Sequence, residues 1–391
     1  MSKKPLTVLL PMVLAVTLLA GPAAAWSPDD GPQFNNPKGN VGQRFKVINR
    51  IERAIANTPR DSTIRIATFL MDRRQAVDEL IAAHKRGVNV KVILDREIAS
   101  APSRRLRAEL GSNRKHRSWA VFCKNSCRGA RGQMHTKFYV FSRVGRTERV
   151  VMISSGNLNN GAANMGWNDI YTITKSLPVY NRYAKIHAEM SKDRPVMPKR
   201  QRYRTHKSGR YKSYFLPNPF ARKAKDPVYR AMQRVHCRGV RKGAGRYGRT
   251  AVNVSMFWWA DDRGVYLARK LLALRREGCR VSITYGAPGH RVARILKPAA
   301  RQGRIALYDS RRDRNMNGVV DLRVHTKYML VSGHYGKDRS SWQVFTGSGN
   351  WAHGSLSGGD EVMLRVTSRR AYKRYMNHYD LVRRVGAWQV R

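Results

Sequence analysis

Hydrophobic and polar positions follow the same order twice along the chain. In each half, a short apolar run precedes a segment whose apolar residues recur every three or four positions and which ends at glycine, and a second apolar run follows. These patterns predict strand, helix and strand, with the two strands parallel in an α/β sheet. The predicted strands cover residues 62–72, 88–95, 250–261 and 279–286, and the predicted helices cover residues 74–87 and 263–278.

The later parts of the two halves match as well. Each half continues with a His-Thr-Lys strand, a basic loop, a strand that ends in Ser-Gly-Asn, and a carboxylate at the start of a further strand. An internal duplication accounts for this repetition. We therefore expect two homologous α/β lobes with mostly parallel central sheets, at residues 26–194 and 226–391, joined by a basic linker at residues 195–225.

The predicted linker contains ten Lys or Arg residues and no acidic residue. It is either a solvated connector or a strip that follows phosphates while its aromatic side chains stack on bases or insert among lipid headgroups. We favour the solvated connector, because linkers in basic proteins are usually basic. The interleaved aromatic residues are Tyr203, Tyr211, Tyr214 and Phe215.

Charge narrows the choice of partner. The 391 residues include 76 Lys or Arg against 25 Asp or Glu, a formal net charge of +51. A field of this size attracts polyanions or anionic membranes. We expect a phosphate-bearing partner, either a phospholipid or membrane surface or a nucleic acid.

The first 25 residues have the pattern of a signal peptide, with Lys3 and Lys4 before an apolar run and a small-residue site at residues 23–25. The run is short for a membrane anchor. Cleavage before Trp26 would leave 366 residues with a formal charge of +49. We expect a secreted, soluble protein.

Export to an oxidising compartment makes disulfides the expected state of the four cysteines. Proximity in sequence favours a bond between Cys123 and Cys127, which leaves Cys237 to pair with Cys279. A zinc site that uses a neighbouring histidine is the alternative, but the cysteine spacing is not a usual zinc spacing.

The two His-Thr-Lys strands carry the candidate chemistry. Residues two apart on a strand face the same side, so His135 points with Lys137, and His325 points with Lys327. Each half adds one hydroxyl, one carboxamide and one carboxylate. These residues are Ser155, Asn157 and Asp169 in the first half, and Ser348, Asn350 and Glu361 in the second.

This set of side chains suits a phosphodiester. Lysine, asparagine and serine side chains can bind the non-bridging oxygens as charge develops on them. One histidine can attack phosphorus to form a phosphohistidine, while the other protonates the leaving oxygen and later activates water. Each carboxylate can orient its own histidine. This chemistry requires no metal or other cofactor.

Two His-x-Lys motifs, each followed by a Gly-Ser-x-Asn-like motif, make residues 44–380 resemble the two-motif members of the phospholipase D superfamily. The resemblance implies two α/β lobes related by a pseudo-two-fold axis around one active site. It also implies that His135 is the nucleophile and His325 the acid. Because one chain supplies both half-sites, we expect activity as a monomer.

The chain departs from that family's pattern at a few positions. Ser142 and Ser332 stand where an Asp is usual, and Ser154 stands where Gly is usual. These changes bear on the geometry of the loops more than on the chemistry. Asp360, beside Glu361, is an alternative orienting carboxylate.

The resemblance favours a secreted phospholipase D that hydrolyses or transfers phospholipid headgroups. Residues 257–259 and Trp351 could line its entrance, although core packing is an equal account. The alternatives are a non-specific secreted nuclease, which the charge favours, and a basic binding protein with a vestigial site, against which the paired motifs argue. Residues 313–321 resemble the start of a calcium loop, but Val324 occupies the position of its final Glu, so a turn rich in Asp and Asn is the simpler interpretation.

Overall fold

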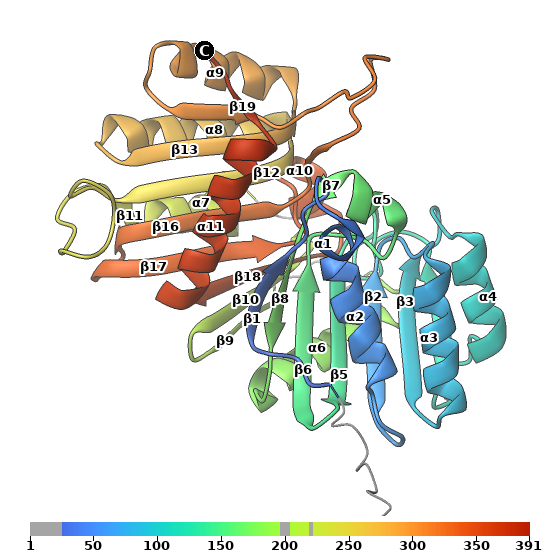
Figure 1. The fold of residues 1–391 in the computed structure, drawn as a ribbon. Helices are drawn as coiled ribbons and strands as arrows, with labels where there is room; N and C mark the ends of the chain where they lie inside the picture. The colour runs from blue at the N-terminus through green and yellow to red at the C-terminus, as the bar shows by residue number, and fades with distance from the viewer. Residues whose placement is uncertain (1–25, 196–203, 219–221) are drawn as a thin grey trace, which may run out of the picture.

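The computed structural model describes residues 26–195, 204–218 and 222–391, and the predicted signal peptide lies outside these ranges. Two large sheets with helices packed on them make up most of the described residues (Figure 1), and a two-stranded sheet is described with the site below. Within these ranges, no helix combines the length and the apolar character needed to cross a bilayer.

The first lobe contains a seven-stranded sheet in the order β1-β8-β6-β5-β2-β3-β4. Its strands are β1 (Gly31–Phe34), β2 (Thr63–Thr68), β3 (Asn89–Asp95), β4 (Trp119–Cys123), β5 (Lys137–Val144), β6 (Thr147–Ser154) and β8 (Asp169–Ile173). Its helices are α1 (Val41–Arg44), α2 (Lys46–Ala56), α3 (Arg74–Lys85), α4 (Ala101–Leu110), α5 (Asn160–Asn164) and α6 (Leu177–Met190).

The second lobe contains a larger sheet in the order β19-β14-β13-β12-β16-β17-β18-β10-β9, with β11 paired to β16. Its strands are β9 (Arg204–Ser208), β10 (Tyr211–Leu216), β11 (Val235–His236), β12 (Ala251–Trp259), β13 (Arg280–Pro288), β14 (Ala306–Asp309), β16 (Lys327–Tyr335), β17 (Asp338–Gly347), β18 (Glu361–Thr367) and β19 (Trp388–Gln389). Its helices are α7 (Pro227–Gln233), α8 (Asp261–Arg276), α9 (His290–Arg301), α10 (His353–Ser357) and α11 (Arg369–Val385).

The predicted α/β class is confirmed, and the helix-linked strand pairs β2–β3 and β12–β13 are parallel as expected. Parallel pairing extends to β4 and β14, whereas hairpins make β5–β6 and β16–β17 antiparallel. The expectation of mostly parallel sheets therefore holds for strand direction in the first sheet, where five of seven strands run the same way. Most neighbouring strands in the two large sheets are nevertheless paired antiparallel, so the expectation does not hold for strand pairing.

Part of the segment that we interpreted as a linker belongs to the second sheet. Residues 204–208 and 211–216 form β9 and β10, and β10 pairs with β18 along its length. The side chains of Tyr211, Tyr214 and Phe215 are buried, so they do not form an exposed stacking strip. Tyr203 lies outside the described residues.

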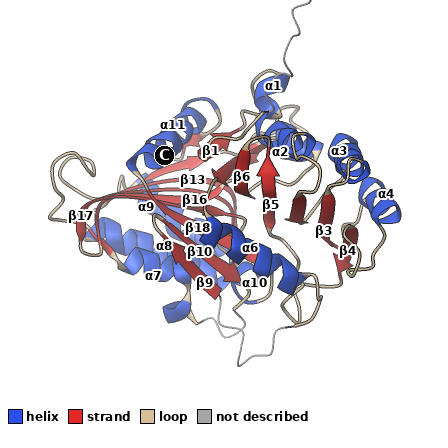
Figure 2. Cartoon of the chain, turned by 90° about the horizontal axis from the view of Figure 1, so that it is seen from below, coloured by secondary structure: helices blue, strands red, loops and turns tan. Residues whose placement is uncertain are grey.

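The two lobes share part of their core. One buried cluster combines side chains of β5, β6, β8 and α6 from the first lobe with side chains of β10, β16, β18 and α11 from the second. Figure 2 shows α6 between the two sheets, where it contacts β2 and β5 on one side and β9 on the other. Burial of apolar surface therefore fixes the lobes relative to each other.

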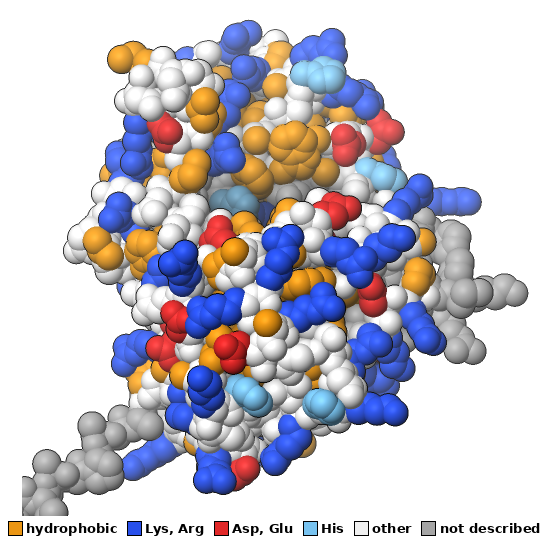
Figure 3. All heavy atoms as spheres, turned by 90° about the vertical axis from the view of Figure 1, so that its right-hand side faces the viewer, with side chains coloured by type: hydrophobic (Ala, Val, Ile, Leu, Met, Phe, Trp, Pro, Cys, Tyr) orange, Lys and Arg blue, Asp and Glu red, His pale blue; other side chains and the backbone are white. Residues whose placement is uncertain are grey.

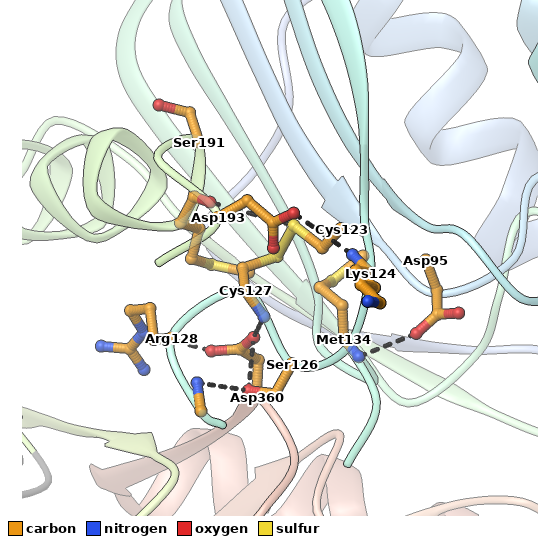
Figure 4. Close-up of a disulfide and its surroundings, with 12 residues drawn as sticks. Asp95, Cys123, Lys124, Ser126, Cys127, Arg128, Met134, Ser191, Asp193 and Asp360 are labelled. Atoms are coloured by element: carbon orange, nitrogen blue, oxygen red, sulfur yellow. Dashed lines mark hydrogen bonds and ion pairs between the residues drawn. A yellow bond between two sulfur atoms is a disulfide. The ribbon is translucent and has the colours of Figure 1, made fainter. Parts of the chain in front are cut away.

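Both predicted disulfides, Cys123–Cys127 and Cys237–Cys279, are present. The first disulfide closes a loop of the first lobe that binds Asp360 of the second lobe (Figure 4). The Asp360 carboxylate accepts hydrogen bonds from the Ser126 hydroxyl at 2.9 Å and from the backbone N–H of Cys127. It also pairs with Arg128 at 3.1 Å. Asp360 is thus a structural tie between the lobes.

Replacing this tie should destabilise the fold strongly. The Arg128 and Asp360 side chains are 6% and 1% exposed, and Asp360→Asn removes the nearer of the two carboxylate charges that compensate Arg128, the other being Glu189 at 3.8 Å. We expect the free energy of unfolding to fall by about 3–5 kcal/mol in urea titrations. Asp78→Asn is the matched control, because its ion pair with Arg105 is half exposed and should be worth under about 1 kcal/mol. Equal losses in the two variants would contradict this assignment.

Candidate active site

The two His-Thr-Lys segments meet at the interface between the lobes. Each histidine stands two residues before its strand, since β5 begins at Lys137 and β16 begins at Lys327. Before His325, β15 (Arg323–Val324) crosses to the first lobe and pairs in parallel with β7 (Gly166–Trp167). The backbone N–H of His325 continues this pairing to the carbonyl of Trp167 at 2.9 Å.

His135 is held by a carboxylate of the opposite lobe. Its Nδ1 lies 2.8 Å from Oε1 of Glu361, while the Ser348 hydroxyl donates to Oε2. Burial alone would raise the pKa of Glu361, but His135, Lys137 and Ser348 together lower it to about 2. The ionised carboxylate accepts the Nδ1 proton, which leaves the lone pair of Nε2 for chemistry. Burial lowers the pKa of His135, so the ring is neutral at pH 7.

His325 is held by a carboxamide of the opposite lobe. Its Nδ1 lies 2.9 Å from Oδ1 of Asn168, whose Nδ2 donates to the carbonyls of Ala162 at 2.8 Å and Gly166 at 3.1 Å. Because both amide protons are used on carbonyls, Oδ1 is the atom that faces His325 and can accept the Nδ1 proton, while Nζ of Lys327 lies 3.1 Å from the same Nδ1. Burial and the charge of Lys327 hold the pKa of His325 well below its usual value.

The prediction that each carboxylate orients its own histidine is therefore wrong in two respects. The partners come from the opposite lobe, and the partner of His325 is Asn168 rather than Asp169. The Asp169 carboxylate instead accepts hydrogen bonds from Thr346 and Tyr375 in a fully buried position, and burial raises its pKa. The alternative role proposed for Asp360 is also wrong, because that carboxylate is used on the disulfide loop.

Chain spacing could have identified Asn168. Glu361 follows Asn350 by eleven residues, and Asn168 follows Asn157 by the same number. The backbone agrees, because the Ser155 hydroxyl accepts from the N–H of Asp169, as the Ser348 hydroxyl accepts from the N–H of Val362. The amide at this position was not predicted, because only carboxylates were expected to orient the histidines.

Both lysines are buried beside their histidines. Each Nζ donates to the backbone carbonyl of the histidine two residues earlier, and Nζ of Lys327 also lies 3.5 Å from the carbonyl of Ser155. Burial lowers the pKa of Lys137 to about 7, although Glu361 and Asp95 favour its charged form. Burial and then the charge of Lys137 hold the pKa of Lys327 well below its usual value. The negative charge in the site is therefore too small to offset the effect of burial on the two lysines.

An aromatic ring flanks each His-Lys pair. The Phe69 ring centre is 4.9 Å from that of His135 and 5.0 Å from Nζ of Lys137. Phe257 stands in the same relation to His325 at 4.6 Å and to Lys327 at 5.1 Å. Phe69 was missed from the sequence, although it occupies the same place at the end of the first strand in its half as Phe257 does.

The serines and asparagines predicted to bind phosphate divide into two groups. The hydroxyls of Ser155 and Ser348 are buried and bind Asn168 and Glu361, so they support the histidine partners instead of facing a phosphate. Asn157 and Asn350 lie at the turns that follow β6 and β17. Asn350 accepts from the N–H of Trp258 at 3.3 Å, which leaves its amide protons for a ligand.

The two serines that stand where the family has an Asp form hydrogen bonds with neighbouring backbone. Ser142 accepts the N–H of Thr63 at 2.8 Å, and Ser332 accepts the N–H of Gly245 at 2.9 Å. Both hydroxyls thus act as hydrogen-bond acceptors for neighbouring backbone. This use fits a supporting role for these positions, not a chemical one.

Two arginines that the sequence did not reveal contact the asparagine turns; Arg263 is buried and Arg73 is partly buried. Arg263 pairs with Asp226 at 2.9 Å and donates to the carbonyl of Asn350 at 2.7 Å. In the first lobe, the Arg73 guanidinium pairs with Glu52 at 2.6 Å, and the backbone N–H of Arg73 donates to the carbonyl of Leu158, in the turn after Asn157, at 3.3 Å. In sequence, each of these arginines follows shortly after the first predicted strand of its half.

The loop with calcium-like spacing is a turn stabilised by its own acidic residues. The Asp313 carboxylate accepts from the N–H groups of Asn317 and Gly318, and Asp321 accepts from that of Arg314. Within the described chain, no three His, Cys, Asp or Glu side chains form a group that could hold a metal ion. The simpler interpretation of residues 313–321 as a turn rich in Asp and Asn therefore fits their contacts.

The site faces a hollow between the lobes. Figure 3 shows this hollow, with hydrophobic side chains on its upper wall and a histidine in its depth. Trp258, which is 43% exposed, follows Phe257 at the end of β12. The imidazoles of His135 and His325 are half-buried, whereas the Lys137 and Lys327 side chains behind them are buried.

Solved structures with a similar fold include two enzymes that align along most of this chain. Polyphosphate kinase from Porphyromonas gingivalis aligns over 89% of the chain at 14% identity with a TM-score of 0.54, and the chain spans 49% of that kinase. Phosphatidylserine synthase from Haemophilus influenzae aligns over 92% of this chain and 87% of its own length, at 12% identity with a TM-score of 0.61.

Nuc, a phospholipase D family member from Salmonella typhimurium, aligns over 46% of this chain and 97% of its own length, at 17% identity with a TM-score of 0.32. No curated protein sequence matches the chain. A family model described as "Cardiolipin synthase, PLD-like domain" matches residues 48–191. By sequence, residues 48–191 of the first lobe are thus similar to a PLD-like domain, and most of the chain shares the fold of the phosphatidylserine synthase structure.

Proposed function

We propose that the protein is a phosphodiesterase that cleaves, or transfers, the headgroup of phospholipids through a phosphohistidine intermediate. The observation that carries this proposal is the convergence of two His-Lys pairs with one ionised carboxylate at the lobe interface. A phosphodiester monoanion would supply the missing negative charge between Lys137 and Lys327. Binding it would restore the charged form of both lysines.

In the first step, Nε2 of His135 attacks phosphorus while its Nδ1 keeps its proton, which is hydrogen-bonded to the Glu361 carboxylate. The new P–N bond forms as the bond from phosphorus to the headgroup oxygen breaks. The electrons of that bond go to the headgroup oxygen, which takes the Nε2 proton of His325. The bound anion raises the pKa of His325, which favours the imidazolium needed as the acid.

In the second step, His325 takes a proton from water, whose oxygen attacks phosphorus. The P–N bond breaks, and its electrons return to Nε2 of His135. An alcohol in place of water gives transfer instead of hydrolysis. Lys137 and Lys327 stabilise the charge on the non-bridging oxygens in both steps.

A phospholipid substrate is supported by two features. The matched family model is that of a cardiolipin synthase domain, and exposed Trp258 stands next to the Phe257–His325 pair at the hollow. The charge of +51 favours a nuclease as the second candidate. The signal-peptide pattern supports our proposal that the protein is exported.

Substrate class can be tested with the pure protein lacking residues 1–25. We expect phosphatidylcholine vesicles with ethanol to give phosphatidylethanol while plasmid DNA stays intact. Nicked plasmid with unchanged lipid would establish the nuclease instead. His135→Ala and His325→Ala should each lower turnover of the preferred substrate by at least about 10²-fold. Full turnover in either variant would place the site elsewhere.

The two histidine partners should differ in importance. Glu361→Gln should lower kcat by about 10²–10⁴-fold, because a carboxylate both fixes the tautomer of His135 and stabilises the positive charge on its ring. Asn168→Ala should cost about tenfold, as for one neutral hydrogen bond. Steady-state rates on bis(p-nitrophenyl) phosphate measure both. Losses of the same size would argue against the unequal roles.

The pH dependence should report Lys137. Its folded-state pKa is about 7, so its ammonium group is present below that pH and is lost as pH rises through it. We expect kcat/KM, which reflects the free enzyme, to fall above about pH 7. The fall in kcat should come at higher pH, because the bound phosphodiester favours the charged lysine. Profiles of kcat and kcat/KM that fall together would contradict this mechanism.

A further inference from the structure

A projecting loop stands on the face that carries the hollow. Residues 313–321 leave the second lobe between Arg312 and Leu322, which form an antiparallel bridge at the base of the loop. Figure 1 shows this loop, in orange at the upper right, extending away from the body of the molecule. Figure 3 views the molecule from that right-hand side and shows the hollow there.

The loop turns its acidic groups inward and its apolar groups outward. The carboxylates of Asp313 and Asp321 are used on backbone N–H groups, at 2.7 Å for both Gly318 and Arg314. Met316 is 90% exposed and Val319 is 58% exposed. Met316 also adopts a positive φ of 56°, which is unfavourable for a residue with a side chain. The stability of the fold explains neither the exposure nor the strain.

Exposed apolar side chains gather at this end of the molecule. Eight large hydrophobic residues are exposed among the residues described, and five besides Val41 of α1 belong to segments at the site end of the strands. The chain from the loop leads through β15 to His325, and Met165 accepts the N–H of Arg323. The five residues are Met165, Trp258, Met316, Val319 and Trp388.

Basic side chains stand between these apolar groups. The guanidinium of Arg312, at the base of the loop, lies 5.1 Å from the ring centre of Trp388. That of Arg323 lies 5.1 Å from the ring centre of Phe257, beside the catalytic pair. Apolar tips flanked by arginines are the combination that enters the boundary between headgroups and acyl chains of anionic bilayers.

We propose that residues 313–321 form a membrane-insertion loop, which places Met316 and Val319 in an anionic phospholipid surface and brings the lipid headgroup to His135 and His325. This inference rests on the proposed phospholipid substrate. A duplex nucleic acid fits the loop less well, because exposed Met and Val side chains gain nothing from phosphates. The preformed turn presents both side chains without a further ordering cost.

Vesicle sedimentation tests the loop directly. Vesicles of phosphatidylcholine with phosphatidylglycerol should bind the wild-type protein, and the double variant Met316→Ser, Val319→Ser should bind about tenfold more weakly, since binding scales with the apolar area inserted. Leu177→Ser is the matched control, because Leu177 is 45% exposed at the start of α6, beyond the end of β8 that lies away from the site. Unchanged binding by the double variant, or equal loss in the control, would overturn the proposal.

Further measurements separate this proposal from the proposed function. Hydrolysis of soluble bis(p-nitrophenyl) phosphate should be the same in the double variant and the wild type, which shows that the fold and site are intact. Loop-dependent vesicle binding without any phospholipid cleavage would sink the proposed substrate but keep the insertion loop. Loss of plasmid binding with vesicle binding unchanged would overturn the loop proposal in favour of nucleic acid.

A tryptophan placed at the tip gives a second readout. In Met316→Trp, the additional emission should be quenched by lipids brominated on the acyl chain. In Leu177→Trp it should not be quenched. Equal quenching in the two variants, or none in either, would refute insertion of this loop.

Discussion

Two buried ammonium groups, those of Lys137 and Lys327, meet across the lobe interface and repel each other. Burial acts against the charged forms of both, the charge of Lys137 lowers the pKa of Lys327 further, and the ionised Glu361 favours the charged form of each. An empty site of this kind is unfavourable and must be held together by the surrounding structure. The shared core and the Asp360 tie to the disulfide loop do so. Under the proposed function, a bound phosphodiester anion would relieve this repulsion.

The same interface also orients both imidazoles. His135 depends on Glu361, and His325 depends on Asn168, so neither lobe contains a complete pair. A single lobe would leave its histidine free to rotate and its lysine without the opposing charge. Docking of the lobes is therefore part of the chemistry as well as of the stability.

The sequence predicted most of the elements and site residues, but not that each histidine takes its partner from the opposite lobe. Regular spacing identified the helix-linked strands, both disulfides and the two His-Lys pairs, because local patterns determine these features. It did not reveal that the partner of His325 is an amide, since chemical expectation outweighed the constant spacing of eleven residues. The burial of β10 and the use of Asp360 on a loop more than 230 residues away depend on tertiary packing, which no local pattern encodes.

The unequal partners of the two histidines give a physical reason for unequal roles. A carboxylate stabilises positive charge on an imidazole, and the ring of His135 gains such charge when it bonds to phosphorus. A neutral amide gives less of this stabilisation, so a protonated His325 releases its proton more readily to a leaving oxygen. The exchange of Glu for Asn between the halves therefore suits His135 as nucleophile and His325 as acid. Reversing the roles would place the better proton donor where a lasting positive charge must be held.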